Sequence, residues 1–210
     1  MTRPIPLPDY AAKAPAEGRL TQWRVRLRVQ PSIAFDALFS DGDEWWTGDA
    51  LTGEPLEWLQ LPFSPGDSLW VQETWRPTLF GDCPVIECKN GAGGDEYLGN
   101  AKPITVEQFD AVDGPRRGWR SPVTMPKWAS RWDLVVESVR VERVQDATED
   151  DALAEGFTDE ILGDQGRASS TTALGVLVEH WIARHGPGSW ERNDWCASAA
   201  VEVRKGNCDE

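Results

Sequence analysis

The chain has 210 residues, of which 40% are hydrophobic, and a formal net charge of −14. This length suits one sizeable domain, and the apolar content excludes an intrinsically disordered protein. No apolar run approaches the ~18 residues that a membrane-spanning helix needs, and residues 1–8 lack the basic start and apolar core of a signal peptide. We therefore expect a single domain over residues 1–210 that stays in the cytoplasm and binds no membrane.

The acidic charge also limits the partners of the protein. A protein that binds nucleic acid through phosphate contacts alone is usually basic, because neutralising the phosphates supplies the affinity. A chain with this charge needs a local pocket to bind nucleic acid, or else binds a basic protein surface.

Neither the cysteines nor the histidines indicate a metal site. The cysteines are Cys83, Cys88, Cys196 and Cys208, which lack the tight paired spacing of zinc ligands and are expected to be free thiols. His180 and His185 are five residues apart on a predicted helix and point in different directions. We expect no metal and no cofactor.

The clearest element is a strand at residues 23–29, where apolar residues alternate with Arg24, Arg26 and Arg28. Such a period-2 pattern is typical of a strand with one buried face. Further strands are predicted at residues 68–74, 85–88, 133–144 and 195–204. Two stretches rich in Gly, Pro and Asp are expected to be mostly loop, at about 36–63 and 81–118.

Two helices are predicted in the last third of the chain. Thr148 followed by three acidic residues marks the start of a helix over 149–155, and Gly156 marks its end. A longer amphipathic helix is expected over 173–185. The Pro-rich opening of the chain is expected to be extended, with at most a short helix near residues 10–16. Because strands and helices do not alternate regularly, the sequence favours an α+β fold, with a curled mixed sheet that forms a small β-barrel and has flanking helices.

Four segments follow one another in an order that matches a known pattern. They are EGRLTQWR at residues 17–24, PFSPGDSLWVQETW at 62–75, WRSPVTMPKWASR at 119–131 with VRVER at 139–143, and GSWERNDW at 188–195. Together they resemble the signature motifs of ASCH proteins of the PUA-like superfamily, in the branch often encoded by bacteriophages and prophages. The resemblance implies a PUA-like β-barrel with a cleft beside the N-terminal segment, and a role in binding RNA or modified bases.

One small branch of the family hydrolyses the acetyl amide of N4-acetylcytidine with a lysine, a threonine and a glutamate. The positions that match its lysine and threonine are Leu20 and Trp23, so the resemblance implies that this machinery is missing. Thr21 has a hydroxyl, but a threonine needs a neighbouring base to act as a nucleophile, and Arg19 stays protonated. The sequence therefore favours a protein that is not an enzyme.

The candidate ligand site combines residues of the first three segments. Glu73 and Trp75 lie at the end of a predicted strand, and Arg120, Trp128 and Arg131 are expected to converge on them at the mouth of the barrel. Tryptophans can stack on a base, and cationic side chains can hold its phosphates. The full set of predicted site residues is Arg19, Thr21, Arg24, Glu73, Trp75, Arg120, Lys127, Trp128 and Arg131.

The same residues also have a structural interpretation. Glu73 could pair with Arg120 or Arg131 and hold the fold together instead of exchanging a proton. The tryptophans could belong to the core. The arginines of the first predicted strand could pair with carboxylates of a neighbouring strand, such as Glu137 or Glu142.

Three functions follow from these observations. The leading hypothesis is a non-catalytic module whose cleft binds RNA or a modified nucleotide. The second is an acidic phage accessory protein that acts on a basic host protein. The third is an amidohydrolase or nuclease that uses Glu73 and Thr21.

Overall fold

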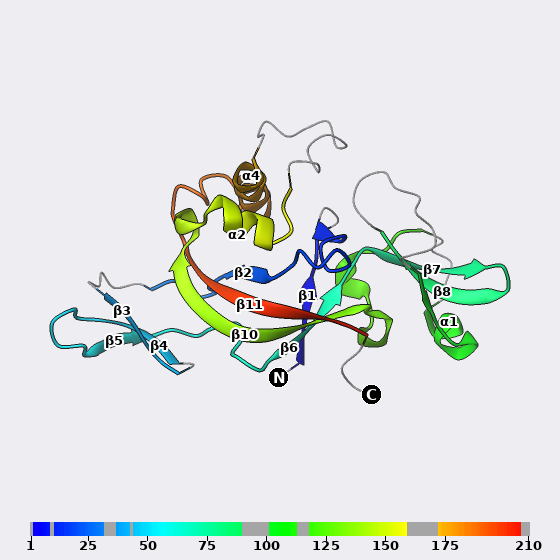
Figure 1. Ribbon diagram of the computed structural model, residues 1–210, viewed down its shortest axis with the longest axis horizontal. Coiled ribbons are helices and arrows are strands. Elements are labelled where there is room, and N and C mark those ends of the chain that lie inside the picture. The colour runs from blue at the N-terminus through cyan, green and yellow to red at the C-terminus, as the bar shows by residue number, and fades with distance from the viewer. Residues whose placement is uncertain are drawn as a thin grey trace.

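The computed structural model describes residues 2–8, 11–31, 37–42, 44–89, 101–112, 118–158 and 172–206. Within these ranges the chain has a mixed α+β fold with three β-sheets and three α-helices (Figure 1). A five-stranded sheet forms the centre of the molecule, and two α-helices lie over one of its faces. Two three-stranded sheets extend from it at opposite ends.

The central sheet joins strands from both ends of the chain. In spatial order these strands are β1 (Thr2–Pro6), β6 (Ser68–Gln72), β10 (Trp132–Arg143), β11 (Trp195–Lys205) and β2 (Gln22–Arg26). β1 runs parallel to β6, and all other neighbours are antiparallel. The four longer predicted strands are confirmed, although β2 ends at Arg26 rather than at residue 29.

The central sheet is curved but open. β10 and β11 bend together along their paired length (Figure 1), with a bulge between Val136 and Ser138. β1 and β2 are the two edges, and no pairing among the described residues joins them into a closed barrel. The predicted α+β fold with a mixed sheet is therefore confirmed, and the curling of this sheet into a small barrel stays a prediction.

Alternation along the strands supplies the main core on one side of this sheet. Leu69 on β6 and Leu134 on β10 are almost completely buried. Leu20 and Trp23 pack into the same core, with exposed fractions of 1% and 7%. Leu20 and Trp23 are thus part of the hydrophobic core.

The segment at 36–63 contains a sheet that the sequence prediction missed. Its antiparallel strands are β3 (Ala37–Asp41), β4 (Glu44–Gly48) and β5 (Pro55–Trp58). Phe39 stacks on Trp46 with ring centres 5.8 Å apart, and Trp46 lies 5.1 Å from Trp58. Gly48 leaves room for the Phe39 ring, because a Cβ there would lie 2.9 Å from it. The loop prediction was wrong because cross-strand aromatic packing stabilises strands that are rich in Gly, Pro and Asp.

The segment at 81–118 is also more ordered than predicted. It contains β8 (Cys83–Cys88), β9 (Ala101–Pro103) and α1 (Val106–Val112), and β7 (Trp75–Phe80) pairs with β8. The short strand predicted at 85–88 is confirmed within β8, and the other elements were missed. Residues 90–100 and 113–117 of the predicted loop lie outside the described residues.

Two of the three predicted helices are confirmed, as α2 (Glu149–Ala154) and α4 (Ala173–His185). They lie next to each other over the central sheet (Figure 1). Thr148 and Asp151 form the predicted cap of α2, and α4 ends at Gly186 with a φ of 88°. In place of the third predicted helix, residues 11–18 form hydrogen-bonded turns, and residues 9 and 10 lie outside the described part of the chain.

Candidate functional site

A pocket opens between the edge strand β2 and helix α4. Its volume is about 90 Å³, enough for several water molecules or one small ring. The pocket is lined by β2, by Pro8 and Ala11, by the segment that follows α2, and by the second half of α4. The side chains that define its chemistry are Trp23, Arg24, Arg26, Glu155, His180 and Trp181.

Helix α4 supplies one wall of the pocket because the wall residues recur at helical spacing. Leu177, Trp181 and His185 follow one another in steps of four, and His180 and Arg184 lie beside them. Leu177 is buried against the core, whereas Arg184 is exposed at the last turn of the helix. The wall therefore changes from apolar to cationic along α4.

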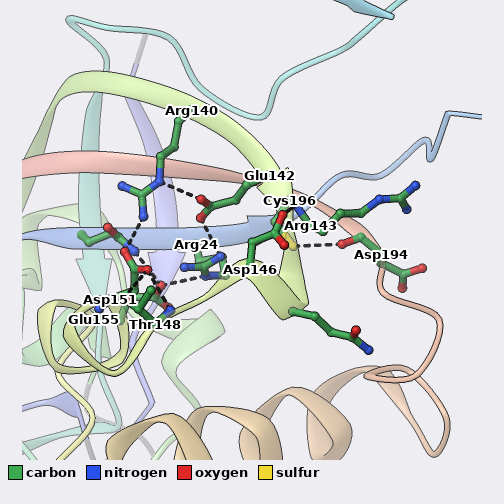
Figure 2. A network of polar contacts seen from close by, with 12 residues as sticks. Arg24, Arg140, Glu142, Arg143, Asp146, Thr148, Asp151, Glu155, Asp194 and Cys196 are labelled. Atoms are coloured by element: carbon green, nitrogen blue, oxygen red, sulfur yellow. Dashed lines mark hydrogen bonds and ion pairs between the residues drawn. The ribbon is translucent and has the colours of Figure 1, made fainter. Parts of the chain in front are cut away.

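The inner end of the pocket is built on Arg24. Its Nε donates to a Glu155 oxygen at 2.8 Å and its Nη1 to a Glu142 oxygen at 2.7 Å, while Gln22 donates to the same Glu155 oxygen at 3.0 Å (Figure 2). The Arg24 side chain has an exposed fraction of only 2%. Burial alone would lower the pKa of Arg24, but Glu155 and Glu142 together hold it above its usual value. Arg24 is therefore a permanent cation between two carboxylates.

Two buried donors in the pocket lining have no hydrogen-bond partner among the described residues. They are Nη2 of Arg24 and Nε1 of Trp181. A buried donor without an acceptor typically costs about 1–3 kcal/mol. Both atoms are also closed to solvent, so the acceptor of a ligand in the pocket would reach them after a shift of the neighbouring side chains, and such a contact would be favourable.

The outer rim of the pocket is cationic. Arg26 donates to the Asp194 carboxylate at 2.6 Å, and Arg192 lies 3.7 Å from the same group. Arg184 and His185 line the pocket, and burial, followed by Arg184 and Arg26, lowers the pKa of His185. Two arginines thus lie near one carboxylate and Arg184 lines the pocket beside them, which gives this edge a local excess of positive charge in an acidic protein.

Aromatic rings make up much of the remaining wall. The Phe157 and His180 rings have centres 5.9 Å apart, and those of Trp181 and His185 are 4.3 Å apart. Burial, followed by the charge of Arg184, lowers the pKa of His180 to about 4, so His180 is neutral near pH 7. The wall therefore offers flat, uncharged surfaces next to a cationic rim.

The structure brings the predicted cluster around Glu73 together, but away from the pocket. Arg131 donates two hydrogen bonds to the Glu73 carboxylate, at 2.6 and 3.0 Å, and Glu73 is fully buried. The Arg120 guanidinium lies 5.0 Å from the centre of the buried Trp75 ring, and Trp128 packs against the same small core. The pairing of Glu73 with Arg131, the structural interpretation of this carboxylate, is confirmed.

The remaining predicted site residues do not meet at one place. Arg19 pairs with a neighbouring carboxylate at the surface, Thr21 is exposed before the start of β2, and Lys127 lies in a short 3-10 helix. Arg24 alone among the nine predicted site residues lines the pocket, and its pairing with Glu142 is confirmed. Arg26, in contrast, pairs with neither of the two carboxylates suggested for these arginines.

Sequence reasoning misses most of the pocket. It considers His180 and His185 only as metal ligands and assigns Trp181 to the apolar stripe of a helix. The signal that could have found them is a helical stripe that turns from apolar to aromatic and then cationic within three turns, ending at Arg184. A helix face that packs only against a hydrophobic core is apolar along its whole length, so an aromatic and cationic end indicates a further role for that face.

Within the described residues, no group of three or more His, Cys, Asp or Glu side chains could hold a metal ion. No helix of that part of the chain is long and apolar enough to cross a membrane. Comparisons with family models, with curated proteins and with solved structures find no match to the chain. The site is therefore interpreted from its own geometry.

Proposed function

We propose that the chain is an ASCH-type module that binds RNA by accommodating one nucleotide, modified or unmodified, in the pocket between β2 and α4, without chemical turnover. The observation that carries the proposal is the combination of aromatic rings, a cationic rim and two unpaired buried donors in one small pocket. The proposal includes closure of the sheet into a PUA-like barrel, a phage origin and a cytoplasmic location, which rest on the sequence resemblance alone.

The aromatic wall supplies affinity without a basic protein surface. A base that enters the pocket meets the rings of Phe157, His180 and Trp181. Stacking of a base on an aromatic side chain is worth about 1–3 kcal/mol. A protein with a net charge of −14 can therefore bind a nucleotide locally although it repels nucleic acid at long range.

The charges orient the nucleotide within the pocket. Arg24 is already opposed by Glu142 and Glu155, so a phosphate at the inner end would add a third negative group. A neutral base can instead place its carbonyl oxygens or ring nitrogens against Arg24 Nη2 and Trp181 Nε1. The phosphate then lies outward, beside Arg26 and Arg184.

The hydrolase alternative finds no support in this arrangement. Glu73, its candidate acid or base, is fully buried and holds Arg131, whereas Thr21 is exposed before the start of β2. A threonine nucleophile needs a base within hydrogen-bond reach. The residues that line the pocket include no serine, threonine or cysteine.

The decisive experiment removes one unpaired donor and keeps the ring. Trp181→Phe deletes Nε1–H, and we expect it to weaken binding of the best nucleotide roughly 3- to 30-fold, since a hydrogen bond to a buried acceptor is lost. The matched control is Trp132→Phe, because Trp132 Nε1 is also buried without a partner in the described part of the chain but does not line the pocket. Calorimetric titration with nucleoside monophosphates and short single-stranded RNAs, at fixed salt, measures both variants and the wild type.

The free proteins provide a second readout. In the absence of ligand the deleted donor makes no hydrogen bond, so its removal should not destabilise the protein. The smaller phenylalanine ring should lower the free energy of unfolding by a similar small amount in both variants. If no RNA or nucleotide binds the wild type more tightly than about millimolar, the proposal fails. Equal affinities of the two variants would place the ligand outside this pocket.

A further inference from the structure

The sheet β3–β5 and its connections, here called the acidic arm (residues 37–62), have two different faces. Leu38, Trp45 and Leu59 pack against the main core and anchor the arm to the body of the molecule. Because side chains alternate along a strand, the residues next to them point the other way. No described element covers this outer face of the arm, which extends from one end of the molecule (Figure 1).

The outer face presents a row of aromatic rings. Phe39 is paired with Trp46 and Trp46 with Trp58 across the three strands, so their rings form a continuous ladder. Trp58 has an exposed fraction of 55%, and Leu56, two residues before it on β5, of 49%. Large apolar side chains that are contiguous and half-exposed are typical of an interaction surface.

The charge of the arm is of one sign. No lysine or arginine occurs between Arg28 and Arg76 in the sequence. The acidic residues of the arm that the structure describes are Asp41, Glu44, Asp49, Glu54 and Glu57. Residues 37–62 therefore combine an aromatic ladder that ends at the exposed Trp58 with a purely acidic surrounding.

We propose that the acidic arm is a docking surface for a protein segment that is rich in lysine and arginine and carries interspersed apolar side chains. Cationic groups are attracted both to the carboxylates and to the face of an exposed tryptophan, and Arg and Lys over Trp are the most favourable such pairs. Apolar side chains of the segment would cover Leu56 and the edge of the ladder.

The same charge argues against two other occupants. A second copy of the chain would place two acidic arms against each other, and RNA would bring its phosphates to a surface without cations. The proposed nucleotide pocket lies between β2 and α4 and shares no residue with the arm. The two proposals can therefore succeed or fail separately.

The test uses the full chain and a short fluorescent peptide in which lysine alternates with leucine, followed by fluorescence anisotropy. We expect Trp58→Ala to weaken binding at least about fivefold, because the exposed ring and its cation–π contact are lost. The control is Phe80→Ala at the tip of the β7–β8 hairpin, where the ring has a similar exposed fraction of 54%. Both substitutions keep the net charge, so nonspecific attraction of the peptide to an acidic protein is the same in both.

Four results would overturn the proposal. The first is equal loss of binding in Trp58→Ala and Phe80→Ala, which would show attraction without a defined surface. The second is equal binding of a peptide with glutamate in place of lysine, and the third is no binding of the lysine peptide up to about millimolar concentration. The fourth is concentration-dependent self-association of the wild type that Trp58→Ala abolishes, because the occupant would then be a second copy.

Discussion

Glu73 shows how the surroundings of one carboxylate decide its role. Arg131 engages both of its oxygens, and the Glu73 N–H contacts the Met125 sulfur at 3.3 Å. Burial, followed by the charge of Glu73, raises the pKa of the nearby Cys88 thiol well above its usual value. The thiol is therefore neutral, and the site contains one ion pair whose charges compensate each other. Such a carboxylate stabilises a fold and is not free to transfer protons.

This role predicts a large effect of Glu73→Ala on stability. Removing one partner leaves the buried Arg131 charge uncompensated, so we expect the free energy of unfolding to fall by about 3–5 kcal/mol. The matched control is Glu202→Ala, which removes an exposed pair with Arg204 and should lower the free energy of unfolding far less. Urea denaturation of both variants measures the difference, and equal effects would contradict the assignment of Glu73 as a structural residue.

At the scale of secondary structure, the start of α2 links several parts of the pocket. The Glu149 carboxylate accepts hydrogen bonds from the N–H groups of Ala173 and Leu174 at 2.7 and 2.9 Å, so α2 caps the first turn of α4. Asp151 accepts from the Thr148 N–H and hydroxyl and pairs with Arg140 (Figure 2). The helices that carry the walls of the pocket are thus held together by their N-terminal caps.

The cap of α2 predicts a pH dependence of stability. Burial would raise the pKa of Asp151, but the hydrogen bonds from Thr148 and then the charge of Arg140 lower it to about 2. A carboxylate whose pKa is lowered in the folded state stabilises it above the unfolded pKa of about 4, and this contribution is lost as the pH falls towards 2. Because the Asp151 side chain is partly buried, with an exposed fraction of 16%, and a helix cap typically contributes about 1 kcal/mol, we expect Asp151→Asn to cost about that much at neutral pH.

Unfolding measured from neutral to acidic pH checks this prediction. Asp151→Asn should approach wild-type stability as the pH falls below about 3, since the wild-type carboxylate is then becoming protonated. Asp150→Asn in the same helical turn is the control, because it makes the same change in charge at an exposed position. A cost of Asp151→Asn that stays constant with pH would show that Asp151 acts by its shape rather than by its charge.

At the scale of the whole molecule, charge is distributed unevenly. The acidic arm has no cation, while Arg26 and Arg192 lie near Asp194 and Arg184 lines the pocket. The arm lies at one end of the molecule (Figure 1), whereas the pocket is lined by residues of β2 and α4. Although the net charge is −14, the two proposed surfaces differ in their local charge. The acidic arm suits a cationic partner, and the pocket suits a ligand with a phosphate.

This distribution predicts a weak salt dependence of RNA binding. Contact with one or two phosphates gives a slope of log K against log salt of about −0.7 to −1.4, far shallower than for a basic nucleic-acid-binding surface. Lengthening a single-stranded RNA beyond a few nucleotides should not increase its affinity, because the surrounding surface is acidic. Titrations at several salt concentrations measure the slope. A steep slope, or affinity that rises steadily with RNA length, would contradict binding through one pocket.

Helices and strands that have local sequence signals can be predicted from the sequence alone. Alternation around Arg24 and Arg26 predicts β2, and Thr148 with its acidic neighbours predicts α2, because period and capping act within a few residues. The arm was missed since its strands depend on contacts between Phe39, Trp46 and Trp58 across three strands. Pattern within one strand carries no information about such partners.

The contacts between residues far apart in the sequence are seen only in the folded chain. Arg24 finds Glu155, 131 residues away, and Arg131 finds Glu73, 58 residues away. Both arginines were predicted ligand-binding residues, and in the folded chain each belongs to a buried ion pair. The pocket lies beside α4 and is lined in part by Trp181, which the sequence analysis assigned to an apolar stripe. The physical reason is that burial and pairing set the role of a charged side chain, and both depend on neighbours brought together by folding.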